Sequence, residues 1–379
     1  MPQIRCANSP LKHISSCFRR LPGKGKRLSR ADSENFLEAD QEEVRIGDGI
    51  LKFTPDQLKE FTGGFSDENY LDGTSTRSGF LNRVYRGKVI IDEESNWVRN
   101  VIVEVKEPRF HLEYDVWEQT QIRLFTDPVI GGHPNVAKLY GYCNDGMLGL
   151  VYDCDALQTM HNMVPDESFT WAMRMKVAFG LAHLLEFLES QTPPLRILNL
   201  EAHSILIDKH YNPLVFGFGV AFGGILRRPA PFHLLQHYIC WLYSDFNLAL
   251  GIVPPSIDVY GFGASLLTLI TKRHDILWCT YHGRVPSHIP MTGLLKVSPN
   301  DVCLHDFTES IVQRSFLGED EYLSQDGSDV TQLTMECVKV FDEIGLTAPR
   351  PEISDVVNRL KRLAVVCKLG LQRDNSLSC

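Results

Sequence analysis

The sequence lacks most of the short motifs that mark a membrane span, a metal site or a hydrolytic enzyme. It has no run of eighteen apolar residues and no apolar core near the N-terminus, which argues against a transmembrane helix and a secretory signal. Its 10 cysteines include no C-x-x-C pair and no zinc-ligand spacing, so neither a disulfide framework nor a structural metal is expected. The motifs HExxH and GxSxG are also absent, which argues against the common zinc protease and serine hydrolase designs. Scattered cysteines of this kind are typical of reduced thiols in a cytosolic protein.

Acidic residues are missing from the first 30 positions, where eight Lys and Arg residues give a charge of +8. Because the whole chain of 379 residues carries −9, the remainder carries −17. We expect residues 1–49 to form a disordered arm, first basic and then acidic, since such a composition buries too little apolar surface to fold. An alternative is attraction to an anionic membrane surface, worth about 1 kcal/mol per basic residue, with Cys6 and Cys17 as candidate lipidation sites. The acidic body argues against nucleic-acid binding.

Hydrophobic periodicity divides the remaining chain into a strand-rich part and a helical part. A short helix is expected after Thr54, which is a suitable N-cap before Pro55, and Gly63 and Gly64 should end it. Alternating runs then predict strands at residues 83–91, 98–107, 136–143 and 148–153, with one helical stretch near 112–125. From about residue 157 the spacing is helical, at 170–190, 256–273, 328–344 and 353–369. The sequence therefore predicts an α+β protein, with a small β-rich lobe followed by a larger helical lobe.

Five segments in this order carry a family resemblance. They read "VIVEVK" at 101–106, "HPNVAKLYGYC" at 133–143, "LVYD" at 150–153, "DVYGFGASLLTLITKR" at 258–273 and "APRPEISDVVNRLKRL" at 348–363. Together they resemble a protein kinase, and more closely the plant receptor-like cytoplasmic kinases, over residues 53 to 365. The resemblance implies a bilobal kinase-like fold, with an N-lobe at 53–153, a C-lobe at 154–367 and a flexible tail at 368–379.

The resemblance also assigns expected roles in the segment "ILNLEAHSILID" at 197–208, where kinases carry His-Arg-Asp-Leu-Lys-x-x-Asn. Asn199 stands at the position of the catalytic base, and an amide does not accept a proton near neutral pH. Glu201 replaces a lysine that would neutralise the transferring phosphate, so the charge is reversed. Ser204 replaces the amide that would hold magnesium, and Gly217 replaces the principal metal-binding aspartate. These four positions are degenerate, which predicts loss of phosphoryl transfer.

The positions that resemble a nucleotide site are only partly retained. Of the three glycines of a phosphate-binding loop, Gly79 alone remains, and Arg77 and Asn82 hold the other two positions. Lys106 resembles the lysine that pairs with nucleotide phosphates, and with Gly79 and Val84 it forms a vestigial cofactor site.

Glu104 lies two residues before Lys106 and shares its face of the strand, so we expect it to point into the pocket and block it. The alternative partner for Lys106 is a helix carboxylate such as Glu118.

Two further features follow from the resemblance. Asp258 matches an aspartate that ties the backbone of the catalytic loop to the large lobe, which is a structural role. Where the family has a regulatory loop, this chain has no Ser or Thr between 205 and 243, so activation by phosphorylation of such a residue is not expected. The apolar and basic residues of this loop either pack onto the large lobe or form a partner surface. The candidates for that surface are Arg227, Arg228, Phe232 and Trp241.

The sequence thus predicts a pseudokinase, that is, a catalytically inactive protein of kinase fold, with no cofactor beyond weak ATP binding. We expect it to act as a scaffold, adaptor or decoy in plant immune or receptor signalling. The resemblance implies receptor kinases, active cytoplasmic kinases and immune receptors as partners, and a cytoplasmic location with peripheral contact at the plasma membrane. The alternatives are a nucleotide-gated binding module and a weak or unconventional ATP-dependent transferase. Fold alone does not decide between them.

Overall fold

A computed structural model describes residues 49–75, 81–92, 97–107, 121–197, 200–218, 221–223, 256–274, 309, 311–338 and 349–371. All of them belong to one compact unit, Ile46–Cys379. The predicted arm at 1–49 therefore lies almost entirely outside the described residues.

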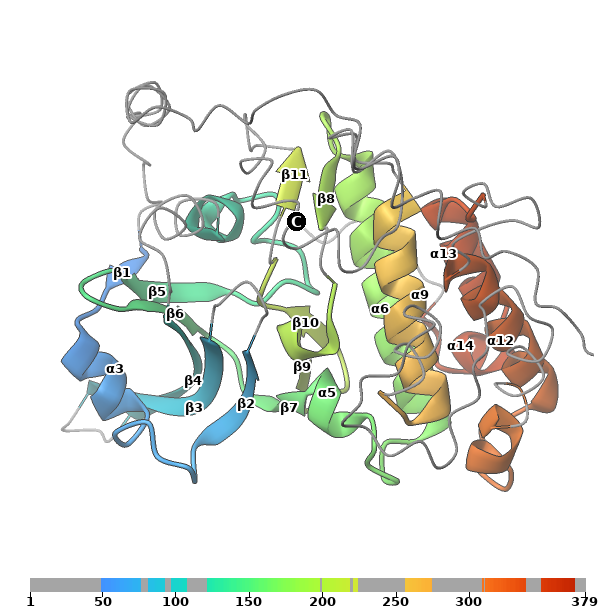
Figure 1. Cartoon of the computed structure of the whole chain (residues 1–379), viewed down its shortest axis with the longest axis horizontal. Coiled ribbons are helices and arrows are strands. Elements are labelled where there is room, and N and C mark those ends of the chain that lie inside the picture. Colours follow the sequence, from blue (N-terminus) through green and yellow to red (C-terminus); the bar gives the residue numbers. More distant parts are fainter. Residues whose placement is uncertain are drawn as a thin grey trace, which may run out of the picture. The chain divides into compact units, whose positions relative to one another are not determined.

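The N-terminal part is a sheet of six strands in the order β1-β5-β6-β4-β3-β2 (Figure 1). Neighbouring strands pair antiparallel, except that β1 and β5 are parallel. The strands are β1 (Leu51–Lys52), β2 (Tyr70–Ser75), β3 (Leu81–Asp92), β4 (Trp97–Glu107), β5 (Leu139–Cys143) and β6 (Leu148–Tyr152).

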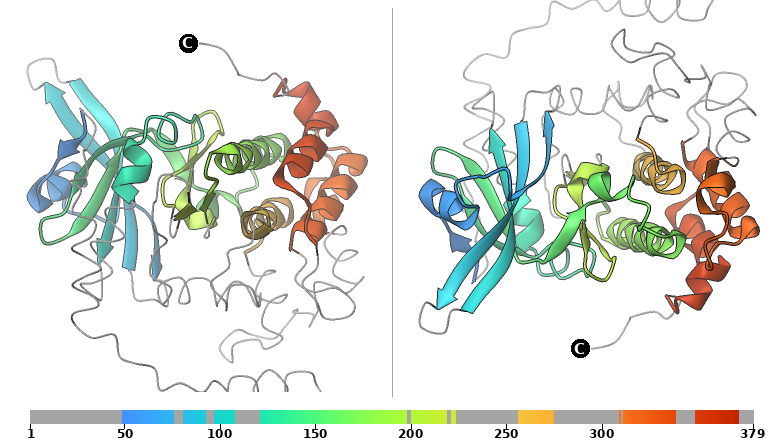
Figure 2. Two further views of the ribbon diagram at one scale, coloured as in Figure 1. Left: turned by 90° about the horizontal axis from the view of Figure 1, so that it is seen from above. Right: turned by 90° about the horizontal axis from the view of Figure 1, so that it is seen from below.

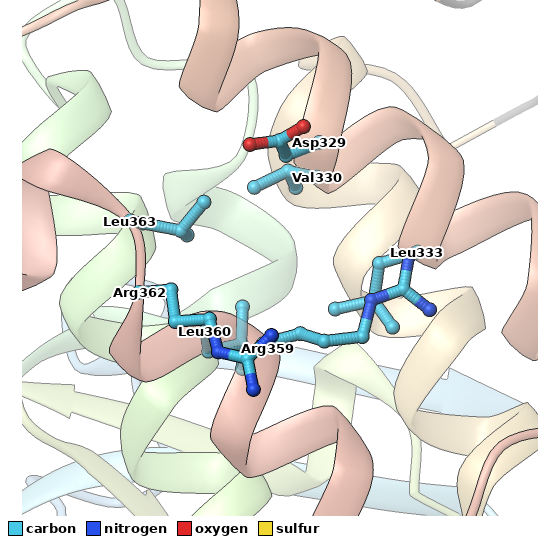
Figure 3. A pocket seen from close by; sticks show the side chains of 7 residues that line it. All are labelled: Asp329, Val330, Leu333, Arg359, Leu360, Arg362 and Leu363. Carbon is cyan, nitrogen blue, oxygen red and sulfur yellow. The ribbon is translucent and has the colours of Figure 1, made fainter.

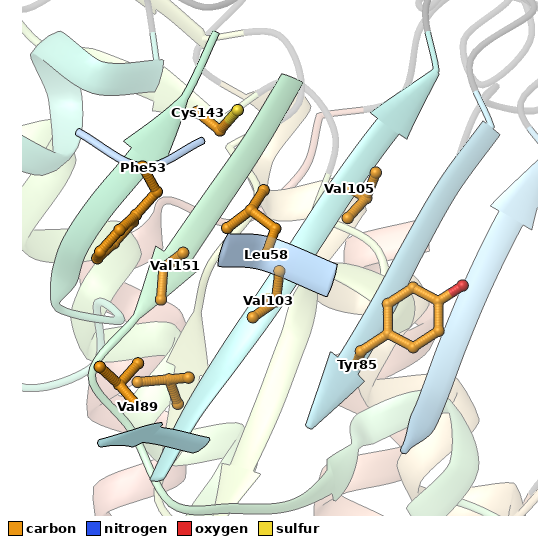
Figure 4. Packing of buried hydrophobic residues seen from close by; sticks show 9 residues of the cluster. Phe53, Leu58, Tyr85, Val89, Val103, Val105, Cys143 and Val151 are labelled. Carbon is orange, nitrogen blue, oxygen red and sulfur yellow. The ribbon is translucent and has the colours of Figure 1, made fainter. Parts of the chain in front are cut away.

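Helix α3 (Pro55–Phe61) covers one face of this sheet and begins where the sequence predicts. The Thr54 hydroxyl accepts a hydrogen bond from the Gln57 backbone N–H, and the Gln57 side chain accepts one from the Thr54 backbone, which forms a capping box. Leu58 projects from α3 into a cluster with Phe53, Val103 and other buried residues (Figure 4). Its Cδ1 lies 2.3 Å from where a Cβ at residue 149 would stand, so a glycine is required there.

The helical part begins with β7 (Ala156–Thr159) and α5 (Met160–Met163) and is built on α6 (Trp171–Ser190) and α9 (Ser256–Thr271). Both long helices are buried over most of their residues, as expected for core helices. Helices α12 (Ser324–Val338), α13 (Ile353–Lys361) and α14 (Ala364–Lys368) pack beside them (Figure 2). The α+β architecture with a β-rich lobe and a helical lobe is therefore confirmed.

Two small sheets connect these parts. Strand β9 (Ile205–Asp208) pairs with both β7 and β10 (Pro213–Val215), and β8 (Leu195–Ile197) pairs with β11 (Ala221–Gly223). The 3-10 turn η2 (Ala202–Ser204) precedes β9. A parallel bridge between Val136 and Val215 joins this hairpin to the segment that enters β5.

The predictions of secondary structure need correction at four places. Strand β2 was not predicted, because its sequence "YLDGTS" contains an Asp-Gly pair that usually indicates a turn. The run at 136–143 forms a strand only from Leu139, and a helix at 311–316 was not predicted.

The helix expected at 353–369 is two helices, α13 and α14. The Asp326 carboxylate accepts hydrogen bonds from the backbone N–H groups of Ala364 and Val365, and so a new helix starts there. Helix α14 extends to Lys368, one residue past the predicted lobe boundary.

Candidate functional site

Alternation along β4 places Glu104 and Lys106 on the face of the sheet opposite α3. Val103 and Val105 point into the cluster under α3, so their neighbours point the other way. The Lys106 Nζ lies 3.1 Å from the Glu104 Oε1, which is the ion pair that the sequence predicts. Both residues are buried, with 1% of Glu104 and 8% of Lys106 exposed. Burial lowers the pKa of Lys106, and the Glu104 carboxylate acts in the opposite direction.

Tyr152 extends this ion pair into a buried hydrogen-bond network. Its hydroxyl lies 2.9 Å from the Glu104 Oε2 and 2.5 Å from the backbone oxygen of Phe216, so the single phenolic proton is shared between two acceptors. Burial, followed by the charge of Glu104, raises the pKa of Tyr152 well above its usual value. The network therefore ties β4 and β6 of the sheet to the segment that follows β10.

Gly217 follows Phe216 and lies beside this network. A Cβ at residue 217 would lie 3.3 Å from the Ser204 Oγ and 3.9 Å from the Glu104 Oε1. The structure thus brings Ser204 and Gly217, two of the positions predicted to be degenerate, together with Glu104, which lies far from both in the sequence. Both Glu104 oxygens already have partners in Lys106 and Tyr152, so the residues present do not fit a magnesium ion held at this place.

Asp258 on α9 contacts the backbone at the start of the segment 197–208. Its Oδ2 accepts a hydrogen bond from the backbone N–H of Ile197 at 3.1 Å, which confirms the predicted structural role. Burial raises the pKa of Asp258 well above its usual value, and its Oδ1 has no hydrogen-bond partner within the part of the chain that the structure describes. Glu201, at the N-cap of η2, is half-buried.

Phe218 belongs to the packing between the two lobes. It is fully buried, its ring centroid lies 5.1 Å from that of Phe125, and its backbone N–H donates to the Gln121 Oε1 at 3.3 Å. Val84 is also buried and pairs with Glu104 across β3 and β4. Both side chains are therefore part of the packed interior.

Several predicted residues lie outside the described part of the chain. They are Cys6, Cys17, Gly79, Glu118, Asn199, Arg227, Arg228, Phe232 and Trp241. Their predicted roles stay predictions.

Sequence reasoning missed three residues of this region: Tyr152, Asp72 and His203. Tyr152 stands within "LVYD", but its hydroxyl contacts depend on Glu104 and Phe216, which lie 48 and 64 residues away. Asp72 contacts His203 across 131 residues. No local pattern signals contacts at such separations.

Two hollows in the described part of the protein lie away from Lys106. A pocket of about 210 Å³ between α12 and α13 has a floor of Leu and Val side chains and a rim that includes Arg359 and Asp329 (Figure 3). The other is a groove of about 1010 Å³ that follows β3, and Cys154 lines it. Burial and the neighbouring acidic residues raise the pKa of the Cys154 thiol to about 12, so it is not a thiolate nucleophile near neutral pH.

The described residues also contain no group of His, Cys, Asp and Glu side chains that could hold a metal ion. No helix among them has the length and apolar character needed to cross a membrane.

Similarity to curated proteins is found among plant kinases. The chain is 30% identical over 256 residues to probable serine/threonine-protein kinase PBL6 of Arabidopsis thaliana. The matched region covers 62% of this chain and 55% of that protein. The chain is 29% identical over 243 residues to probable serine/threonine-protein kinase PBL16 of the same plant, covering 60% and 55%. Receptor-like cytosolic serine/threonine-protein kinase RBK1, also from this plant, is 28% identical over 231 residues, covering 59% and 46%.

The chain therefore spans about half the length of the curated relatives it matches, and no family model matches it. Its homologues are plant receptor-like cytosolic serine/threonine kinases, and its fold is the bilobal protein-kinase-like fold.

Proposed function

From the homology to plant receptor-like cytosolic kinases, we propose that this protein has kept the kinase fold without phosphoryl transfer and acts as a scaffold, adaptor or decoy in signalling. The observation that carries the proposal is the buried contact of Glu104 with Lys106 and Tyr152, beside Gly217. The Glu104 carboxylate thereby occupies Lys106, which resembles the lysine that pairs with nucleotide phosphates in kinases.

The physical argument concerns charge and position. Phosphoryl transfer depends on positioned groups that neutralise the phosphates, and the metal ions supply most of that neutralisation. Here the Lys106 ammonium faces a carboxylate at 3.1 Å, so phosphates would have to displace that carboxylate or approach it. Gly217 offers no side chain to a metal, and Asn199 and Glu201 remove the base and a neutralising charge in the sequence. Binding surfaces and conformation are then what remain for function.

The partners follow from the relatives. Receptor-like kinase homologues point to protein–protein interactions in signalling, and we propose receptor kinases, active cytoplasmic kinases and immune receptors as partners. The proposed location is the cytoplasm, with peripheral contact at the plasma membrane through the basic residues of the first 30 positions.

Nucleotide binding by the full chain tests this function. We expect no change in melting temperature with millimolar ATP, either alone or with Mg²⁺ or Mn²⁺, because the proposal leaves no site for the metal complex. A shift that does not need metal would instead favour a nucleotide-gated binding module.

A shift that needs metal, together with transfer of the γ-phosphate to a protein substrate, would favour an unconventional transferase and end the scaffold proposal. The variant Lys106→Met must then abolish the transfer. Lys88→Met is the matched control, because Lys88 is an exposed lysine on the neighbouring strand β3.

A further inference from the structure

Three imidazole rings and one carboxylate meet between the sheet and the helical part, away from Lys106. His161 on α5 lies between His203 on η2 and His274, which follows α9, with ring centroids 3.8 Å and 4.0 Å apart. Both pairs are stacked, with interplanar angles of 23° and 25°. Asp72 on β2 reaches this stack, and its Oδ2 lies 3.0 Å from the His203 Nδ1. We call Asp72, His161, His203 and His274 the histidine clasp.

The clasp joins the two lobes through side chains. The Asp72 Oδ2 also accepts a hydrogen bond from the Thr159 hydroxyl at 2.6 Å, and the Asn162 Nδ2 donates to the backbone oxygen of Leu71 at 2.6 Å. The His274 Nε2 lies 2.9 Å from the backbone oxygen of His161, which holds the stack in register. Strand β2 is thus fixed to α5 and η2 by contacts separated by 87 to 131 residues in the sequence.

We propose that the histidine clasp is a conformational device that holds β2 against the helical part near neutral pH and releases it in acid. It does not rest on the proposed scaffold function, because none of its four side chains contacts the Lys106 network among the described contacts.

The protonation states explain the release. A proton on His161 places a positive charge in stacked contact with two imidazole rings in a partly buried site, and this arrangement favours the neutral ring. His203, His274 and Asp72 are the titratable groups that face His161, and only Asp72 favours its protonated form.

The pKa values of His161 and Asp72 agree with release in acid. Burial, followed by the two neighbouring imidazoles, lowers the pKa of His161 from 6.5 to about 4. Burial acts to raise the pKa of Asp72, but its hydrogen bonds with His203 and Thr159 outweigh burial and leave the pKa lowered. A group whose pKa is depressed in the closed form stabilises that form above its ordinary pKa, and this stabilisation is lost as the pH falls towards the depressed value. The clasp is therefore complete above about pH 6.5 and fails towards pH 4.

Amide hydrogen exchange of the full chain, corrected for the intrinsic effect of pH, tests the release. Because His161 is partly exposed, we expect protection of the β2 amides to fall about tenfold between about pH 7 and about pH 4.5, less than the full shift allows. The amides of α12, which contains no histidine, serve as the internal reference and should keep their protection. An equal loss in α12 would mean global unfolding and would overturn the proposal.

Two variants make the test specific. His161→Phe keeps a ring that can stack between its neighbours but cannot take a proton, so its β2 protection should change less than about threefold over the same pH range. His133→Gln is the matched control, because burial also lowers the pKa of His133 to about 4, and its ring contacts lie with Phe187 and His183. In this control the protection of the β2 amides should depend on pH as it does in the unaltered protein.

A third variant covers the case in which His161→Phe does not fold. Asp72→Asn removes the charge that His203 and Thr159 contact, so protection of β2 should already be lowered about tenfold at pH 7 and should depend little on pH. An unchanged pH response in His161→Phe, or unchanged β2 protection in Asp72→Asn, overturns the clasp.

Discussion

Removing the charge of Glu104 should destabilise the protein, because it leaves the Lys106 ammonium buried without its carboxylate. Glu104→Gln is the sharpest change, since the amide keeps the shape and an acceptor for the Tyr152 hydroxyl. The charge that faces Lys106 at 3.1 Å is lost together with the acceptor there, because an amide whose oxygen accepts from Tyr152 turns its NH₂ group towards the ammonium.

Two known costs set the range of the loss in unfolding free energy expected for Glu104→Gln. Breaking a buried pair by removing one partner costs about 3–5 kcal/mol. The penalty at pH 7 cannot exceed the free energy of deprotonating a lysine with its ordinary pKa, which is about 5 kcal/mol. Burial already lowers the pKa of Lys106, so deprotonation is less costly and the lower end of the range applies. We expect about 3 kcal/mol, which is about 4 °C in melting temperature for a chain of this size.

The assay is thermal unfolding of a double-mutant cycle made from Glu104→Gln and Lys106→Met. Replacing both charged groups removes the unpaired charge, so the double variant should be clearly more stable than Glu104→Gln alone. Lys88→Met, at an exposed position of β3, should leave the melting temperature within about 1 °C. A double variant no more stable than Glu104→Gln would refute the buried ion pair.

Three further predictions test the surrounding fold. In Gly180→Ala the new Cβ would lie 2.7 Å from the Pro213 Cγ. This overpacking should lower the free energy of unfolding in urea by about 1–3 kcal/mol. An unchanged midpoint would contradict the packing of α6 on β10. Thr54→Ala removes the capping contact with Gln57 and should cost about 1 kcal/mol in the same assay, and no loss would contradict the capping box. Because burial lowers the pKa of His133 to about 4, its contribution to the free energy of unfolding is present above pH 6.5 and is lost as the pH falls to about 4. Melting temperatures of His133→Gln should therefore fall less over this pH range than those of the unaltered protein, and parallel curves would contradict the burial of His133.

Parts of the structure were predictable because they depend on neighbouring residues. Thr54, Pro55 and Gln57 start α3 through contacts within one turn, so the sequence predicts the start of the helix correctly. The alternation of β4 likewise places Glu104 and Lys106 on one face, and their contact needs no long-range information. Strand β2 was missed because the Asp-Gly pair favours a turn locally, whereas pairing with β3 decides its conformation.

The sequence by itself determined the two-lobe α+β architecture and the pairing of Glu104 with Lys106, because periodicity and residue spacing along one element decide both. Only the tertiary structure decided that Tyr152 joins this pair to Phe216, and that Asp72 reaches His203. Those contacts join residues that lie 48 to 131 positions apart, and only the packing of the sheet against the helical part brings them within hydrogen-bond distance.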